Sequence, residues 1–367
     1  MKVSIITRHF ITNYGSLCQS YALQRVIESM GYEVDIIDYI REDEDYRHIT
    51  STLVKKSDFW NKNFLTRFIY KLLQNPNYII GGRAFEKYRL KYLNMTKLYS
   101  SFEELKKDPP EADIYCTGSD QVWGTIGNDR YDKAYFLEFA EGKKCISYAA
   151  SFGKTKFDDE YITNLSRLVK KYSALLMREK SAVDILEKLK LDNVKQVLDP
   201  TLLLDKNEWL DLAEGEIKDK DYVLIYQLHR NKRMDQYAKE FAKKTGLKLI
   251  RVSPSLHHIN RGGKFVYLPN LGEFLSYINN AKYIITDSFH GTAFAINFNK
   301  DFVDILPGET ATRNQSILEL TGLEDRILRD YGDFSFIDRH IDYDKVNDII
   351  GRKRVESLDY LSQSLKN

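Results

Sequence analysis

The feature that most constrains this chain is a repeated alternation of short apolar runs with helical patterns. Residues 3–7 read VSIIT, a glycine turn and a helical pattern follow, and residues 34–40 return as VDIIDYI. Such a strand–helix–strand unit predicts two parallel strands, because crossovers between parallel strands are right-handed. We expect the first helix to begin at Ser16, which forms an S-x-x-Q capping pattern with Gln19.

The same alternation continues along the chain and restarts after a break. Asp199-Pro200 interrupts the first series, and a fresh series begins at residue 221. We therefore predict an α/β fold with two Rossmann-like domains that face a central cleft, spanning 1–205 and 206–340, and a closing helix over 341–367. Further strands are expected at 113–118, 145–150, 174–178, 195–199, 221–228, 247–252, 282–285 and 302–306.

Composition excludes several classes of protein. A net charge of +2 among 367 residues gives no global field for nucleic acid. The three cysteines form no Cys-x-x-Cys pair, so we expect buried thiols and neither a zinc site nor a disulfide framework. No run approaches the roughly 20 apolar residues of a membrane span, and the N-terminus does not resemble a signal peptide. We expect a cytoplasmic protein without a metal or cofactor.

Polar and small residues follow several of the predicted strands. Because ligands of parallel sheets bind at the carboxyl ends of strands, these residues are candidates for one site. Taken singly, Asn13 and Asp120 are also typical of caps or turns, and Arg178 of a surface ion pair. The segments are NYGS (13–16), TGSDQVW (117–123), YAASFG (148–153), Arg178-Glu179 and TDSFHGT (286–292).

A histidine stands where an apolar strand turns into an apolar helix. His290 falls in the first turn of that helix, where free N–H groups and the helix dipole favour an anion. An imidazole beside a bound anion is suited to proton transfer near neutral pH. The alternative is a buried histidine bonded to a nearby carbonyl, and this stretch alone leaves both open.

Seven segments together resemble the polysaccharide pyruvyl transferase family. They occur in the expected order from residue 1 to about residue 330, so the resemblance covers nearly the whole chain. One departure is Gly124, where asparagine is usual and which would suit a different acceptor. The segments are NYGSLCQSYALQ (13–24), TGSDQVW (117–123), YAASFG (148–153), REKS (178–181), VLDPTLLL (197–204), TDSFHGTAFAINFNKDF (286–302) and RNQSILELTGLEDR (313–326).

The resemblance implies a GT-B-like fold and a specific reaction. Such enzymes move pyruvate from phosphoenolpyruvate onto two hydroxyls of a sugar or lipid-linked oligosaccharide, forming a cyclic ketal and releasing phosphate. On this basis His290 transfers a proton, Asp120 orients a sugar hydroxyl, and Asp287 caps the helix or supports the histidine. Donor-binding candidates are Arg178, Arg313, Ser288 and Gly291, and acceptor-binding candidates are Asn13, Tyr14, Gly15, Ser119, Gln121 and Trp123.

Two other functions fit the same fold. One is a nucleotide-sugar glycosyltransferase, in which Glu309 or Glu319 would hold the ribose, although neither has a spacing that supports this. The other is a sugar-binding protein without catalysis. The segments DED (43–45) and DYD (342–344) imitate metal motifs, but we interpret both as solvated, as we do the whole acidic run 41–45.

The segment 55–97 is locally basic. It has ten basic residues against Asp58 and Glu86, and apolar residues from Trp60 to Leu73 recur at helical spacing. A basic amphipathic helix with aromatic residues can bind the anionic inner face of a membrane. The alternative is that its apolar face packs on the first sheet.

Overall fold

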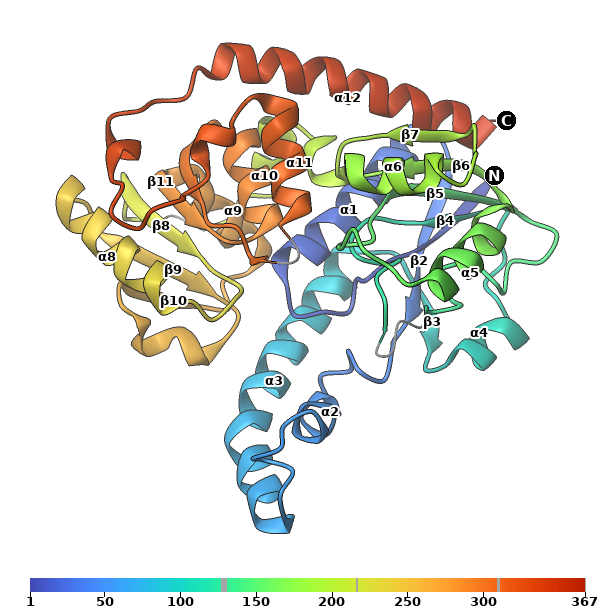
Figure 1. The fold of residues 1–367 in the computed structure, drawn as a ribbon, viewed down its shortest axis with the longest axis horizontal. Helices are drawn as coiled ribbons and strands as arrows, with labels where there is room; N and C mark the ends of the chain where they lie inside the picture. Colours follow the sequence, from blue (N-terminus) through green and yellow to red (C-terminus); the bar gives the residue numbers. More distant parts are fainter. Residues whose placement is uncertain (127–130, 216, 309–310, 367) are drawn as a thin grey trace.

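The computed structural model describes residues 1–126, 131–215, 217–308 and 311–366, and it consists of two parallel sheets flanked by helices (Figure 1). The first sheet has the order β3-β2-β1-β4-β5-β6-β7, and the second has the order β10-β9-β8-β11-β12. Their bounds are β1 Lys2–Ile6, β2 Glu33–Tyr39, β3 Met95–Tyr99, β4 Ile114–Thr117, β5 Lys144–Ala150, β6 Tyr172–Met177, β7 Val194–Gln196, β8 Tyr222–Tyr226, β9 Leu249–Ser253, β10 Lys264–Tyr267, β11 Ala281–Thr286 and β12 Asp301–Asp304.

The helices complete two α/β layers. Continuous apolar runs such as KVSII in β1 are buried because helices cover both faces of a parallel sheet. The predicted fold class is confirmed. The helices are α1 Tyr14–Ser29, α2 Ile49–Lys55, α3 Phe64–Tyr92, α4 Phe102–Lys107, α5 Asp159–Val169, α6 Lys180–Glu187, α7 Lys206–Leu210, α8 Lys232–Thr245, α9 Leu271–Asn280, α10 Phe289–Asn297, α11 Thr312–Thr321 and α12 Tyr343–Lys366.

Each sheet has one point where the strand order reverses. In the first sheet it lies between β1 and β4, and in the second between β8 and β11. Such switch points open a crevice at the carboxyl ends of the strands, which is where ligands of these folds bind. The topology therefore places one potential binding edge on each sheet.

The first helix begins two residues earlier than predicted. Its cap is Asn13, whose side chain accepts a hydrogen bond from Gly15 N at 2.7 Å. The Gln19 side-chain amide instead donates to the Thr7 hydroxyl and to Ser16 O. The prediction from the S-x-x-Q pattern was wrong, because Asn13 is as good a helix cap as Ser16 and lies three residues earlier in the sequence.

Strands β3 and β10 were not predicted. Both lie at sheet edges and are largely half-buried or exposed, so they lack the apolar runs of central strands. The prediction of a solvated run at 41–45 was also wrong in part. Glu44 and Asp45 are buried, because Glu44 pairs with Arg8 at 2.6 Å and Asp45 with Arg47 at 2.8 Å.

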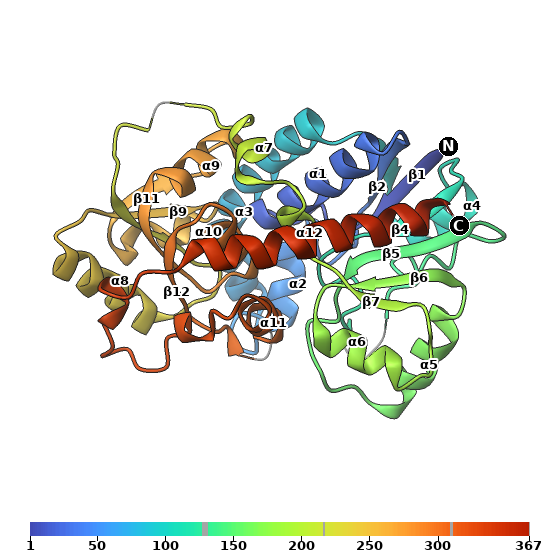
Figure 2. The same ribbon diagram turned by 90° about the horizontal axis from the view of Figure 1, so that it is seen from above.

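The two sheets are joined by a packed interface and by the last helix. The Tyr14 ring stacks on Phe274 with centroids 4.3 Å apart, and its hydroxyl donates to a backbone carbonyl of the second domain. Seen from above, α12 runs across both sheets, as predicted for the closing helix (Figure 2). Its Ser357 hydroxyl accepts from Leu198 N at 3.0 Å, which fastens the helix to the first domain.

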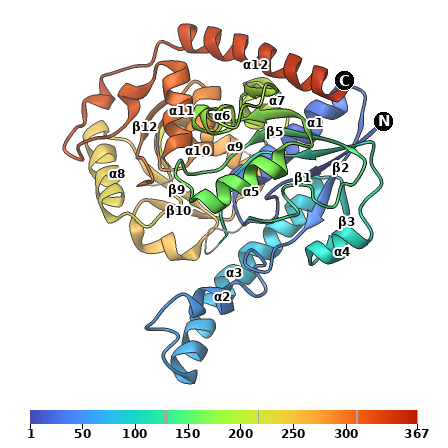
Figure 3. The same cartoon turned by 45° about the vertical axis from the view of Figure 1, so that its right-hand side comes forward.

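A long helix projects from the first domain. The first half of α3 extends with α2 away from both sheets, on the side opposite α12 (Figures 1 and 3). The second half returns to the core through Gly82 and Phe85. No helix of the described residues is both long and apolar enough to span a membrane.

Candidate functional site

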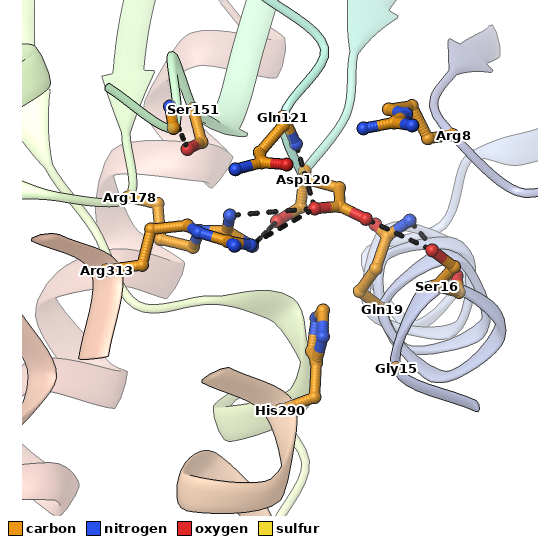
Figure 4. A network of polar contacts seen from close by, with 12 residues as sticks. Arg8, Gly15, Ser16, Gln19, Asp120, Gln121, Ser151, Arg178, His290 and Arg313 are labelled. Carbon is orange, nitrogen blue, oxygen red and sulfur yellow. Dashed lines mark hydrogen bonds and ion pairs between the residues drawn. The ribbon is translucent and has the colours of Figure 1, made fainter. Parts of the chain in front are cut away.

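Charged side chains from both domains converge where the two switch points meet. Arg8 follows β1, Asp120 follows β4, Arg178 follows β6 and Asp199 lies after β7. From the second domain, His290 lies in the first turn of α10, directly after β11. Figure 4 shows His290 below an Asp120 that Arg178 and Arg313 approach from one side.

The imidazole of His290 faces the carboxylate of Asp199. Its Nε2 lies 3.8 Å from Asp199 Oδ2. That carboxylate is fixed by the Ser119 hydroxyl at 2.9 Å and by the amide and hydroxyl of Thr201 at 2.9 and 2.7 Å. An aspartate held in this way can orient an imidazole and stabilise its protonated form.

Asp287 does not support His290, contrary to prediction. Its carboxylate accepts hydrogen bonds from the backbone of Leu228 and His229 at 2.7 and 3.0 Å. Ser288, not Asp287, caps α10 through a hydrogen bond from Gly291 N at 3.3 Å. Asp287 therefore fixes the loop after β8, and Ser288 caps the helix of His290.

Asp120 is held in an uncommon backbone conformation. Its φ of 77° lies in the left-handed region, which costs a non-glycine residue on the order of 1–3 kcal/mol. Its carboxylate lies 3.8 Å from Arg178 Nη2 and 3.6 Å from Arg313 Nη1, and accepts from the Ser16 hydroxyl at 3.1 Å. The surrounding structure thus maintains a strained backbone at Asp120 and places its carboxylate close to two guanidinium groups.

The arginines and the histidine of the site have nitrogen atoms without a hydrogen bond. Arg178 donates to Asp199 at 3.0 Å, lies 3.6 Å from Glu179, and stacks over the Phe289 ring at 4.5 Å. Yet Arg178 Nε and Nη2, Arg313 Nε and His290 Nε2 are buried and form no hydrogen bond to any described residue. Unsatisfied buried donors are costly, so their convergence indicates a site for an anionic ligand.

The protonation states follow from burial and charge. Burial alone would raise the pKa of Asp120, but Arg178 and His290 outweigh it and hold that pKa well below its ordinary value. Burial lowers the pKa of His290 despite Asp199 and Asp120, so the imidazole is neutral at pH 7. Burial and Arg178 lower the pKa of Arg313 to about 10, which leaves it charged.

Two glycines at the site allow neighbouring groups to approach the backbone closely. A Cβ on Gly15 would lie 2.1 Å from His290 Nδ1, so the N-terminus of α1 approaches the histidine as closely as a backbone can. A Cβ on Gly291 would lie 2.2 Å from the Thr286 hydroxyl, which makes Gly291 a packing residue. Glycine is required at both positions for close approach, without a positive φ.

The predicted acceptor residues occupy different positions. Tyr14 and Trp123 are fully buried, and the Trp123 N–H donates to a backbone carbonyl, so neither presents a face to a sugar. Asn13 caps α1, and Ser119 supports Asp199. Only Gln121, of these five, lines an open cavity.

A large cavity adjoins the cluster. It has a volume of about 930 Å³, and its wall includes Arg8, Gln121 and Gly153 near the site and Lys55 and Lys56 from the end of α2. By contrast, the gap between Arg178, Asp199, Phe289 and Arg313 holds only about 10 Å³. A small acid would have to separate these groups to enter between them.

Two charged residues of the site were not assigned a role from the sequence. Asp199 lay in a segment interpreted as a domain break, and Arg8 had no motif around it. Their common signal is a position shortly after the end of a strand. Glu179, which belongs to a predicted strand-end segment, accepts from the Ser151 hydroxyl at 2.7 Å and from Phe152 N at 3.2 Å. Within the described ranges, no group of three or more His, Cys, Asp or Glu side chains is arranged to hold a metal ion.

Solved structures with the same architecture support the fold. UDP-GlcNAc 2-epimerase from Neisseria meningitidis, bound to UDP-GlcNAc, has a TM-score of 0.53 at 13% identity, covering 100% of both chains. Anabaena HepE in complex with UDP-glucose has a TM-score of 0.53 at 9% identity, covering 100% of this chain and 99% of its own. A putative UDP-N-acetylglucosamine 2-epimerase from Listeria monocytogenes gives 0.53 at 10% identity, with 99% and 91% covered.

These similarities establish a GT-B-like fold and nothing finer, because the identities are low. No curated protein sequence matches the chain significantly. The family model described as polysaccharide pyruvyl transferase matches residues 13–305, which is most of the chain and contains Asp120, Arg178, Asp199 and His290. The chain therefore belongs to the polysaccharide pyruvyl transferase family.

Proposed function

We propose that this protein transfers pyruvate from phosphoenolpyruvate onto two hydroxyls of a glycan sugar, forming a cyclic ketal. The observation that carries the proposal is the set of buried nitrogen atoms without a hydrogen bond on Arg178, Arg313 and His290 beside an ionised Asp120. Phosphoenolpyruvate carries a carboxylate and a phosphate, and guanidinium groups bind both through paired hydrogen bonds.

Phosphoenolpyruvate would bind where Arg178 and Arg313 face Asp120. The ion pairs of Arg178 and Arg313 with Asp120 are long, at 3.8 and 3.6 Å, so an incoming anion can replace Asp120 as their partner. Because the present gap holds only about 10 Å³, donor binding must move Arg313 on α11 away from the first domain. The N-terminus of α10 adds backbone dipoles that favour the anion.

Proton transfer falls to His290. In the proposed reaction the first sugar hydroxyl adds to C2 of the donor while C3 gains a proton and becomes the methyl group. Phosphate then leaves C2, and the second hydroxyl replaces it. One hydroxyl proton ends on C3 and the other on phosphate, so no redox change occurs. Neutral His290 can accept and return a proton, and Asp199 stabilises the imidazolium in between.

The acceptor would enter through the large cavity. Its volume of about 930 Å³ is large enough for a sugar, and two of its lining residues, Gln121 and Arg8, are drawn near Asp120 in Figure 4. Asp120 is held ionised, so it can accept a hydrogen bond from a sugar hydroxyl but cannot supply a proton. This division of roles leaves orientation to Asp120 and proton transfer to His290.

The rival function is a nucleotide-sugar glycosyltransferase. Glu309 lies outside the described residues, and Glu319 is exposed on α11. Neither the family match nor the cluster favours this alternative.

The proposal is tested first by donor binding, which needs no acceptor. Calorimetric titration of the protein with phosphoenolpyruvate, UDP-GlcNAc and UDP-glucose should show binding of phosphoenolpyruvate alone. Phosphate release should then appear when a panel of sugars is added. Binding and turnover of a nucleotide sugar, with no binding of phosphoenolpyruvate, would overturn the proposal.

A further inference from the structure

The largest concentration of exposed apolar side chains lies on the projecting part of the first domain. Phe64 is 82% exposed, and Leu65, Phe68, Leu72 and Leu73 each expose more than half of their surface. Contiguous exposed apolar surface on a soluble domain marks an interaction site. This set, together with Phe59, Ile69 and Ile80, is called the α3 patch below.

The α3 patch is part of a well-formed helix. Asn63 and Thr66 form a capping box at its start, with Thr66 N donating to Asn63 at 2.9 Å. At about 100° per residue, the apolar side chains from Phe64 to Leu73 cover roughly half of the helix circumference. The alternative, that this face packs on the first sheet, does not hold for these residues, because they are exposed.

The charges along the helical part of the patch have a single sign. Asp58 precedes Phe59, but from residue 59 to residue 85 the chain has no acidic side chain, whereas Lys62, Arg67 and Lys71 lie within or beside the patch. Trp60 and Tyr70, which flank Phe64 and Phe68 in the sequence, contact each other with ring centroids 5.3 Å apart. Apolar residues bordered by cations and amphipathic aromatic rings suit the boundary of an anionic bilayer.

We propose that the α3 patch docks the protein onto membranes that contain anionic lipids. A second copy of the chain fits the patch less well, because a symmetric contact between the two α3 helices would bring Lys62, Arg67 and Lys71 of both copies together, and residues 59–85 contain no acidic side chain to pair with them. A bilayer satisfies both features, since acyl chains receive the apolar side chains and anionic headgroups receive Lys62, Arg67 and Lys71.

Docking would also place the large cavity near the membrane. Thr52, Lys55 and Lys56, at and directly after the α2 helix, line that cavity, and α2 packs against α3. In this respect the inference rests on the proposed function: an acceptor held at the membrane would reach the cluster through the cavity. Membrane binding itself is measured without donor or acceptor, so its failure is distinguishable from failure of the proposed reaction.

The charge requirement is tested with vesicles. Wild-type protein should sediment with phosphatidylcholine–phosphatidylglycerol vesicles at low salt, and weakly with phosphatidylcholine alone or at high salt. Neutralising the three patch cations should lower partitioning on the order of 100-fold, since each contributes roughly fivefold. A matched triple change on α8, at exposed lysines far from the patch, should leave partitioning unchanged. The two variants are Lys62→Gln/Arg67→Gln/Lys71→Gln and Lys232→Gln/Lys239→Gln/Lys243→Gln.

The apolar requirement is tested separately. Phe64→Ser/Phe68→Ser/Leu72→Ser should abolish sedimentation without lowering the melting temperature, because these side chains are exposed. Ile259→Ser/Val355→Ser, at exposed positions elsewhere, should retain it. Absence of binding to anionic vesicles, equal loss in the control variants, or a stable dimer in solution that only the patch variants dissociate would each overturn the inference.

Discussion

Replacing Gly15 with alanine should disable His290 without touching any charged group. The new Cβ would lie 2.1 Å from His290 Nδ1, whereas ordinary contact begins at 3.4 Å. The imidazole would have to move by about 1.3 Å, which is 3.4 minus 2.1. The backbone of α1 cannot yield easily, because the neighbouring Tyr14 is fully buried and stacked on Phe274.

A displacement of this size has a predictable cost. A misplacement of about 1 Å in a catalytic group lowers turnover roughly 100-fold, and overpacking costs about 1–3 kcal/mol of stability. The assay is phosphate release from phosphoenolpyruvate with an acceptor, together with the melting temperature. Gly351→Ala is the matched control, because Gly351 lies in α12 with open space around its Cβ position, and it should leave turnover unchanged.

A double-mutant cycle ties the effect to the histidine. In a His290→Ala background, Gly15→Ala should lower turnover little further, since the displaced group is already absent. Two results would show that the contact between the new Cβ and His290 is not the cause. One is wild-type turnover in Gly15→Ala, and the other is a loss from Gly15→Ala that is as large in the His290→Ala background as in the wild-type background.

The remaining predictions concern the charged groups. His290→Ala should lower turnover about 10²–10⁴-fold with little change in melting temperature, whereas activity that follows only the folded fraction would indicate a structural histidine. Arg178→Lys and Arg313→Lys should each weaken phosphoenolpyruvate binding roughly 10- to 100-fold in calorimetry, because the paired guanidinium donors are lost, and unchanged affinity in both would place them outside the donor site. Asp304, whose carboxyl accepts from Thr292 at 2.5 Å, has a pKa that burial raises to about 7. The contribution of this carboxyl to stability is complete below the ordinary pKa of 3.8 and is lost as the pH rises through about 7. The melting temperature of Asp304→Asn relative to that of wild type should therefore be higher at pH 8 than at pH 5. The same difference in melting temperature at both pH values would contradict this.

The sequence predicted the structure best at the central strands and at the residues that follow them. Buried apolar runs predicted the central strands, and small or polar residues after them predicted Asp120, Arg178 and His290, which the structure brings together. This works because parallel strands deliver their carboxyl ends to one edge. Edge strands β3 and β10 lack that pattern, since only part of each is buried.

Partners across the domain interface were not predictable in the same way. Asp199 and His290 are 91 residues apart and belong to different sheets, so no spacing rule relates them. Tyr14 and Trp123 lie in motifs rich in small and polar residues, which suggested exposure to a sugar, yet the first fills the interface and the second the core. A motif identifies a strand end but not which of its side chains faces the cleft.

The placement of His290 shows why the interface matters for the chemistry. Its own domain supplies the helix, both domains bury the ring and so lower its pKa, and the opposing carboxylates come from Asp199 and Asp120 of the first domain. In the arrangement observed, the neutral imidazole is able to accept a proton, and Asp199 lies 3.8 Å away, where it can stabilise the cation that results. The balance between burial and opposite charge at this one residue therefore depends on contact between the domains.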